Sequence, residues 1–591
     1  MDANEYDVAD AVLAAAHRHP QRPALATGAE TWTYAELVGH ARRVERCLRD
    51  CGVRVGDVVA VQGRRSPRVV AALLGVLLAD AAYLALGEHV PAARLRHMLD
   101  EAAPRLVLAE ETADQELFRH GGAPAVVTHD EARGHEPAPE RRTASTERDD
   151  IAAYLVHTSG TTGVPKGVVI TRRSLAAHRR AVHQLFELAP DDRVLQASSL
   201  AFDVAAEEIW PTLTAGALVD ILPTGLGEVS YDRFSRIVHG RGITVCNLPA
   251  SYFSGWAAHL DESGTALPTL RLVVAGSEEL PVEAARAWCS AERARLVHAY
   301  GVSEATITSV ACDVTPDLTT GERIPIGAAL PGVRTAVVDE RDSPVPAGTE
   351  GELLIGGPGV ALGYLGTDPL PEDRFLRTAV AGAGQGPWYR TGDWVREERG
   401  LLHFLGRVDD QLKINGVRVE PGEIAAVLAA QPAVTDAKVF RIGETLVGCV
   451  CTPHPVDREA MTGRLRPVLP PAMVPAEILG WDAFPLTEGG KVDVRALRAA
   501  ATARLDEGVA PAGAPGVRTV LRRLWQEVLG APEVGADSDF FALGGGSLSA
   551  ARLSSALLRE TGVTVKLRTV FAHPRFGDYL QQVELASDRQ A

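Results

Sequence analysis

Cysteine, aromatic residues and long apolar runs are all scarce in this chain of 591 residues. Its seven cysteines form no Cys-x-x-Cys pair and have no histidines at zinc-ligand spacing, so we expect reduced, buried thiols and neither a disulfide framework nor a zinc site. No stretch is apolar for the length of a membrane-spanning helix, and the first residues lack the basic start and apolar core of an export signal. These absences predict a cytoplasmic protein without a membrane partner.

Basic residues are also in the minority, with 60 Lys and Arg against 76 Asp and Glu and a net charge of -16. A negatively charged surface repels nucleic acid, so we expect no nucleic-acid partner. Any phosphate site must then be a local arrangement of phosphate-binding groups. The chain is several times longer than a typical domain, which predicts two or three separate cores.

Strand-length apolar runs alternate with helical stretches through most of the chain. Residues 58–61, 272–275 and 352–355 have the length and apolar character of buried strands, whereas 67–78 and 174–188 have helical periodicity. This alternation predicts an α/β protein with several buried sheets.

The C-terminal stretch has a different composition. A Pro-, Gly- and Ala-rich segment at 508–516 predicts a flexible tether, since it cannot hold a regular element. Helical patterns follow at 517–529, 547–561 and 576–585, which predicts an all-α bundle too small for a catalytic cleft. Ser547 follows three glycines at the start of the second of these helices.

The strongest local motif is YLVHTSGTTGVPKG at residues 154–167. Glycines and hydroxyl side chains let backbone N–H groups surround a polyphosphate, and Lys166 adds a positive charge. The spacing differs from that of an ordinary P-loop because Gly167 follows the lysine where Ser or Thr is required. The motif therefore indicates a phosphate site of another kind.

This loop resembles the signature of the adenylate-forming superfamily, and six further segments match the family's order. They are TWTYAEL at 31–37, AYGVSE at 299–304, GELLIGG at 351–357, YRTGD at 389–393, GRVDDQLKING at 406–416 and PLTEGGKVD at 485–493. With Ser547 in its small helical bundle, the chain resembles an adenylation and peptidyl-carrier didomain of a nonribosomal peptide synthetase.

The resemblance implies an organisation into three folded parts. We expect a large adenylation subdomain with several β-sheets at residues 1–408 and a small, mobile α/β subdomain at 409–502. A linker at 503–516 would lead to a four-helix-bundle carrier domain at 517–587.

The resemblance also implies roles for single residues. Lys491, Glu304 and Lys166 would be catalytic, with Glu304 holding Mg2+, a hard cation that prefers oxygen ligands. Asp409 would be the hinge of the small subdomain, and Ser547 would carry 4'-phosphopantetheine. The nucleotide ATP would be bound by Thr158, Ser159, Gly160, Thr161, Thr162, Gly163, Tyr300, Asp393 and Arg407.

The segment FDVAAEEI at 202–209 resembles the start of the family's substrate pocket. Asp203 matches the carboxylate that pairs with an α-ammonium, which favours an α-amino acid. A buried carboxylate at Glu207 is costly unless it meets a cation, so we expect a basic substrate, ornithine or a modified ornithine ahead of lysine and arginine. The alternative is that Glu207 turns to solvent and Glu208 is a helix-surface residue. The other matched lining positions are Val204, Asn247, Val273, Ala275, Ala299, Ile307 and Thr308.

Two of the positions that depart from the family's pattern bear on expected contacts. His298 stands where an asparagine usually contacts adenine, and Gly546 replaces the acidic residue or histidine before the carrier serine. The first departure affects an expected adenine contact. The second could change which phosphopantetheinyl transferase or downstream protein accepts the carrier.

The implied activity is that of an ATP-dependent amino acid adenylating ligase that loads its own carrier domain for nonribosomal peptide or antibiotic biosynthesis. No condensation or thioester-release motif is visible, so a condensation or tailoring protein would act in trans, and an MbtH-like activator is a further conceivable partner. Two alternatives are an acyl- or aryl-CoA synthetase and a catalytically silent carrier scaffold. Asp203 and Ser547 speak against the first, and Lys166, Glu304, Asp393 and Lys491 speak against the second.

Overall fold

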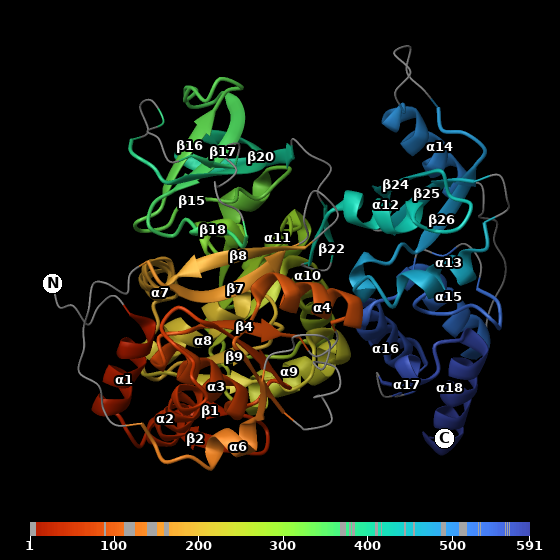
Figure 1. Cartoon of the computed structure of the whole chain (residues 1–591). Coiled ribbons are helices and arrows are strands. Elements are labelled where there is room, and N and C mark those ends of the chain that lie inside the picture. Colours follow the sequence, from red (N-terminus) through yellow and green to blue (C-terminus); the bar gives the residue numbers. More distant parts are fainter. Residues whose placement is uncertain are drawn as a thin grey trace. The chain divides into compact units, whose positions relative to one another are not determined.

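The computed structural model in Figure 1 divides into two compact units. Unit 1 contains Met1–Thr158, Pro165–Thr224 and Ile237–Asp409, and unit 2 contains Ser159–Val164, Gly225–Arg236 and Asp410–Ala591. The structure describes all residues except 1–6, 88–89, 111–124, 139–149, 159–164, 367–373, 377–379, 381–383, 408–411, 415–416, 443–444, 453–455, 486–491, 507–516, 530, 532–533, 562, 564, 566–567 and 591.

Unit 1 contains a large sheet whose central strands run parallel. Its strand order is β15-β14-β13-β12-β11-β9-β10-β1-β2, and the strands from β13 to β1 pair in parallel. Their bounds are β1 (Pro23–Ala26), β2 (Thr31–Thr33), β9 (Arg193–Gln196), β10 (Leu218–Ile221), β11 (Val245–Pro249), β12 (Leu272–Gly276), β13 (Arg295–Tyr300), β14 (Val310–Asp313) and β15 (Ala328–Ala329).

The second sheet has the order β18-β8-β7-β4-β3-β5-β6. Its β7 and β8 form an antiparallel pair on either side of the expected phosphate loop, with Thr158 opposite Lys166. The bounds are β3 (Val58–Gln62), β4 (Ala82–Leu86), β5 (Leu106–Ala109), β6 (Ala125–Thr128), β7 (Ala152–Thr158), β8 (Lys166–Thr171) and β18 (Gly363–Tyr364).

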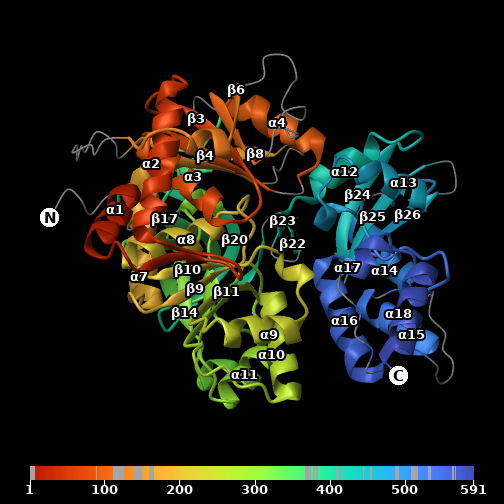
Figure 2. The ribbon, with the colours of Figure 1, turned by 90° about the horizontal axis from the view of Figure 1, so that it is seen from below.

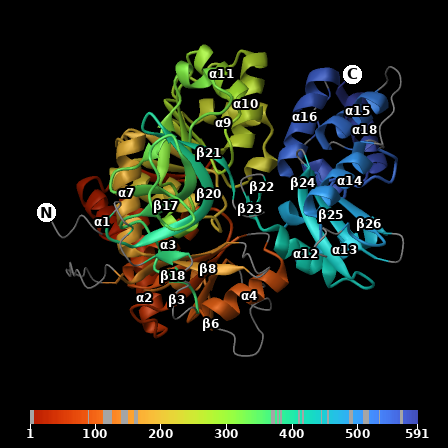
Figure 3. The same cartoon turned by 90° about the horizontal axis from the view of Figure 1, so that it is seen from above.

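A third sheet of antiparallel strands is built around β17 and β20, which Figure 3 shows beside β21. Leu354 and Ile355 of β17 are buried, as the apolar run there predicts. The strands are β16 (Arg334–Val338), β17 (Glu350–Gly356), β19 (Phe375–Leu376), β20 (Trp388–Glu398) and β21 (Leu401–Arg407).

Helices α3 and α8 lie between the strands of the first two sheets (Figure 2), and one apolar core includes residues of both sheets. Helix α3 begins at Pro67 after a Ser66 cap and has the predicted bounds, whereas α7 lies two residues earlier than predicted. The helices up to residue 320 are α1 (Val8–Arg18), α2 (Tyr34–Asp50), α3 (Pro67–Leu78), α4 (Ala92–Ala102), α6 (His129–Arg133), α7 (Arg172–Phe186), α8 (Val204–Ala215), η4 (Leu226–Glu228), α9 (Tyr231–Gly240), α10 (Ala250–Ser263), α11 (Val282–Ser290), η5 (Ser303–Ala305) and η6 (Pro316–Thr320).

Unit 2 begins with a small α/β part. A three-stranded sheet has the order β24-β25-β26, and β22 pairs with β23. The elements are β22 (Leu412–Ile414), β23 (Val417–Val419), α12 (Pro421–Ala429), β24 (Asp436–Ile442), β25 (Thr445–Cys451), α13 (Arg458–Leu465), η7 (Pro471–Met473), β26 (Glu477–Trp481) and α14 (Val494–Asp506).

The last part of unit 2 is helical. Trp525 is fully buried and packs edge-on against Phe540 and Phe576, which gives this short stretch a core of its own. The mixed α/β fold followed by a helical carrier region confirms the predicted fold class, although the last helix extends beyond the predicted residue 585. The helices are α15 (Val517–Leu529), α16 (Ser547–Thr561), α17 (Arg568–Ala572) and α18 (Phe576–Gln590).

Two expectations from composition can be compared with the described residues. Across the part of the chain that the structure describes, no helix is both long and apolar enough to cross a membrane. All seven cysteines are free, but Cys51 is exposed, so the expectation that all are buried is wrong.

Candidate active site

Lys166 and Glu304 both contact Tyr364, a residue that the sequence did not indicate. Strand β18 pairs with β8, which places Tyr364 opposite Val168, and the Nζ of Lys166 is 5.5 Å from the centroid of the Tyr364 ring. The hydroxyl of Tyr364 donates a hydrogen bond to Oε1 of Glu304 over 2.9 Å. Glu304 is buried, which makes its carboxylate a candidate ligand for a hard cation such as Mg2+.

Tyr300, Asp393 and Arg407 form a second group of predicted residues. The hydroxyl of Tyr300 donates to Oδ2 of Asp393, and Nη1 of Arg407 pairs with Oδ1 of the same carboxylate. Burial, and next the negative charge of Asp393, raise the pKa of Tyr300, so the tyrosine stays protonated as a donor. The structure therefore brings together three residues that the resemblance assigns to ATP.

The chain between Tyr300 and Thr308 approaches itself closely. A Cβ at Gly301 would lie 1.6 Å from the carbonyl oxygen of Ile307, so only glycine fits there. Thr306 and Ile307 both have positive φ, at 60° and 69°, a costly conformation for β-branched residues. The strain lies within the segment predicted to contact both nucleotide and substrate.

Asp203 stands at the N-terminus of α8 as a partly buried carboxylate. Its Oδ2 accepts a hydrogen bond from the hydroxyl of Ser303. Burial raises the pKa of Asp203, and the negative charges of Glu207 and Glu304 add to the effect. A ligand cation beside Asp203 would stabilise its ionised carboxylate and lower the pKa again, so the position suits an ammonium group.

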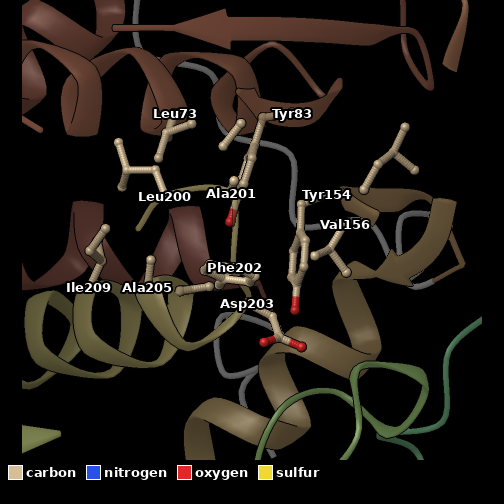
Figure 4. A pocket seen from close by; sticks show the side chains of 13 residues that line it. Leu73, Tyr83, Tyr154, Val156, Leu200, Ala201, Phe202, Asp203, Ala205 and Ile209 are labelled. Carbon is tan, nitrogen blue, oxygen red and sulfur yellow. The ribbon is translucent and has the colours of Figure 1, made fainter. Parts of the chain in front are cut away.

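A small cavity lies on one side of Asp203 (Figure 4). Its wall is mainly apolar, with Leu73 from α3, Ile209 from α8, and Tyr83 and Tyr154 from strands of the second sheet. Figure 4 shows the Tyr154 hydroxyl directed toward Asp203, and this buried hydroxyl has no hydrogen-bond partner among the described residues.

Glu207 is buried rather than turned to solvent, with 1% of its side chain exposed. Its Oε1 accepts a hydrogen bond from Nδ2 of Asn247 over 2.8 Å, and its Oε2 lies 2.9 Å from Nε2 of His178. The structure therefore brings two predicted pocket residues together and adds His178, which the sequence did not indicate.

Glu208 is also buried, so the alternative that it is a helix-surface residue is wrong. Its carboxylate accepts hydrogen bonds from the backbone N–H and hydroxyl of Ser198 and from Nε2 of Gln196. Burial raises the pKa of Glu208 to about 7 despite these donors.

The remaining predicted lining residues do not share one face of the sheet. Asn247 is the register partner of Val274, and Gly276 is the partner of Ala299, so Asn247 and Ala299 lie on the face covered by α7. Val273 and Ala275 alternate with these residues and lie on the other face. Ile307 and Thr308 are buried, and Val204 is partly buried in the first turn of α8.

His298 has a partner of its own. The ring nitrogen Nδ1 is 2.9 Å from the carbonyl oxygen of Pro325, which can only accept a hydrogen bond, so Nδ1 carries the proton. Its side chain is buried at the end of β13, two residues before Tyr300.

Several predicted residues lie outside the described residues. These are Asp409, Lys491 and five residues of the phosphate loop, namely Ser159, Gly160, Thr161, Thr162 and Gly163. Ser547 is described only as the first residue of α16, without its side chain. Before it, a Cβ at Gly545 would lie 2.3 Å from the ring of Phe540, which explains one glycine of the Gly-Gly-Gly segment.

The residues present fit the expected nucleotide and cation. Asp393 offers a carboxylate and Arg407 a fixed cation for the sugar and phosphate of ATP, and Glu304 offers hard oxygen donors for Mg2+. The short helical part offers a serine at a helix start for a covalent phosphopantetheine arm.

Comparisons with known proteins agree with this arrangement. A family model described as AMP-binding enzyme matches residues 12–365, and one described as phosphopantetheine attachment site matches residues 519–583. The structure of holo-PA1221, a nonribosomal peptide synthetase protein with adenylation and PCP domains bound to a vinylsulfonamide inhibitor, is similar with a TM-score of 0.82 and 27% identity, covering 100% of this chain and 99% of that one.

Two curated relatives are much longer than this chain. CymA of Salinispora arenicola, which carries the name of a nonribosomal peptide synthetase, is 36% identical over 577 residues, which is 96% of this chain and 7% of CymA. The phosphinothricin tripeptide synthetase PhsC of Streptomyces viridochromogenes is 34% identical over 579 residues, 96% of this chain and 52% of PhsC. Since one family model alone matches more than half of the residues, this chain belongs to the AMP-binding enzymes, as an adenylation domain followed by a carrier domain with a phosphopantetheine attachment site.

Proposed function

We propose that this chain joins an α-amino acid to AMP at the expense of ATP and then transfers the aminoacyl group to a phosphopantetheine thiol on Ser547. The observation that carries the proposal is the partly buried Asp203, whose raised pKa calls for a cation close to Glu304. An α-ammonium supplies that cation, which acyl and aryl acids lack. A free-CoA ligase would also have no use for the carrier domain.

The first step needs no protein nucleophile. A carboxylate oxygen of the amino acid attacks the α-phosphorus of ATP. The bond between the α-phosphorus and the oxygen that bridges to the β-phosphate breaks, and pyrophosphate leaves with that oxygen. The chain's own contribution is positioning and charge neutralisation. Bound Mg2+ would neutralise phosphate charge, and Glu304, oriented by the Tyr364 hydroxyl, is the residue that would hold it.

We assign the remaining residues by their motif positions. Tyr300, Asp393 and Arg407 bind the nucleoside, and Lys166 with Thr158, Ser159, Gly160, Thr161, Thr162 and Gly163 binds the phosphates. Lys491 meets the substrate carboxylate and the α-phosphate. Asp409 is the hinge about which residues 409–502 turn between the two half-reactions, and 503–516 link them to the carrier at 517–587.

We also propose a basic side chain for the amino acid, with ornithine ahead of lysine and arginine. The support is that Glu207 is buried in the first turn of α8, beside Asn247. Its Oε2 receives no hydrogen bond from the described residues, so a second ammonium of the substrate would be its missing donor.

The loaded amino acid would then pass to another protein. A phosphopantetheinyl transferase is required to modify Ser547, and a condensation or tailoring protein would accept the cargo in trans. An MbtH-like activator is a further proposed partner. The named relatives are synthetases of peptides, which supports a place in secondary-metabolite assembly.

Amino-acid-dependent exchange of labelled pyrophosphate into ATP tests the proposal. Ornithine, lysine and arginine should support exchange, and Lys491→Ala should abolish it. Exchange with no amino acid would contradict the proposed function and favour a silent scaffold. Exchange with a neutral amino acid alone would contradict only the basic substrate.

A further inference from the structure

The carboxylate of Glu207 has two neighbours from different elements. Asn247, in β11, donates to Oε1, and His178, in the middle of α7, places Nε2 2.9 Å from Oε2. The side chains of His178 and Glu207 are 3% and 1% exposed, so water does not screen their interaction. The chain thus places a histidine ring beside a carboxylate assigned to the substrate pocket.

The contact between His178 and Glu207 is close, but it lacks hydrogen-bond geometry. Nε2 of His178 and Oε2 of Glu207 approach to ion-pair distance, yet neither atom has a hydrogen-bond partner of acceptable geometry among the described residues. A buried polar atom without a partner is costly, so both atoms are poised to gain one. A donor on the substrate's side chain would complete the coordination of Oε2.

We propose that His178 is a specificity-determining residue that positions the Glu207 carboxylate for the substrate's side chain. This inference rests on the proposed function and deepens it. A carboxylate that is held in place favours a cationic donor on the substrate's side chain over a neutral one.

His178 affects the environment of the Glu207 carboxylate from a separate helix. Helix α7 packs against α8, which carries Glu207, so the ring and the carboxylate come from neighbouring helices. A phenylalanine at this position would leave Oε2 without its polar neighbour. A glutamine would keep a hydrogen-bond donor at a similar place, which tests whether a polar partner there is sufficient.

Ornithine and glutamine are suitable probes because their side chains have similar length and differ in charge. The test compares kcat and KM for pyrophosphate exchange with the two amino acids in the wild-type protein, His178→Phe, His178→Gln and the control His183→Gln. His183 lies on the same helix, partly buried, and has no assigned role. Thermal melting of each variant reports whether it is folded.

We expect His178→Phe to lower the ornithine-to-glutamine ratio of kcat/KM about tenfold or more, mainly through KM for ornithine. His178→Gln should restore the ratio to within about threefold of the wild-type value or exceed it, and His183→Gln should leave it unchanged. A ratio unchanged in both His178 variants, or an equal loss for both amino acids, would overturn the inference.

Failure of the proposed function has a different signature. A wild-type protein that exchanges with no amino acid contradicts the function and this inference together. If the wild-type protein prefers a neutral amino acid, the same variants are compared with that amino acid against ornithine. An unchanged ratio there overturns the role of His178 while leaving adenylation intact.

Discussion

The hydroxyl of Tyr364 donates a hydrogen bond to the buried carboxylate of Glu304 over 2.9 Å. The same ring lies 5.5 Å from the ammonium of Lys166, so one side chain contacts both residues assigned to the charged end of ATP. The pairing of β18 with β8 fixes this arrangement, because it holds Tyr364 opposite Val168 of the strand that follows the phosphate loop.

Tyr364→Phe should weaken the use of Mg2+ while leaving the fold intact. The variant loses a hydrogen bond to a charged group, a contribution of about 1.5–3 kcal/mol, which corresponds to about ten- to a hundredfold in activity. Pyrophosphate exchange measured against Mg2+ concentration checks this. Tyr579→Phe, in the helical carrier core, is the matched control and should behave as wild type. Equal Mg2+ dependence in both variants would refute a role for Tyr364 at the cation.

Asp393→Asn should raise the KM for ATP by about tenfold or more, because the charge that pairs with Arg407 and accepts from Tyr300 is lost. The KM for the amino acid should change little, since these three residues are assigned to the nucleotide. Steady-state exchange kinetics with each substrate varied in turn separate the two effects. A change confined to the KM for the amino acid would contradict the assignment of Asp393 to the nucleotide site.

Glu208 should make stability depend on pH. Its pKa rises from 4.5 to about 7 on folding, so the folded state binds an extra proton between these values. Stability from this group is therefore fully present below pH 4.5 and is lost as the pH rises through about 7, by at most about 1.4 kcal/mol per pH unit.

Chemical denaturation from pH 4.5 to 7.5 measures this effect as the difference between the wild-type protein and Glu208→Gln. The slope of stability against pH should be smaller in the variant. Glu283→Gln removes an exposed carboxylate and should keep the wild-type slope. Parallel curves for wild type and Glu208→Gln would show that Glu208 does not titrate in this range.

Ser547→Ala should remove the attachment of phosphopantetheine and leave adenylation unchanged, because the modification and the adenylation chemistry use separate parts of the chain. Intact mass after incubation with CoA and a phosphopantetheinyl transferase measures the attachment, and pyrophosphate exchange measures adenylation. A variant that still gains the arm would assign the modification to another residue.

Local features of the fold could be predicted from the sequence. Ser66 and Pro67 mark the start of α3 through a side-chain cap and a fixed φ, and the apolar run at 272–275 gives a buried strand. These signals lie within a few residues of the elements they define. The end of α18 differs from the predicted one because helix ends fray and the sequence specifies their last residues weakly.

The contacts that complete the site could not be predicted in this way. Ser303 donates to Asp203 across 100 residues of sequence, and Tyr364 donates to Glu304 across 60. Motif positions identify the carboxylates, but their neutral partners depend on which strands pair and which helices pack. His178 is the clearest case, since a lone histidine in a helix gives no sign of the carboxylate that it will meet.

Loading of the carrier tests the central claim most directly. Protein that carries phosphopantetheine is incubated with ATP, Mg2+ and single amino acids, and its intact mass is measured. We expect the mass to increase by one aminoacyl group with ornithine, and no increase without ATP or in Ser547→Ala. A protein that adenylates an amino acid yet never gains its mass, with any amino acid of the panel, would contradict the account.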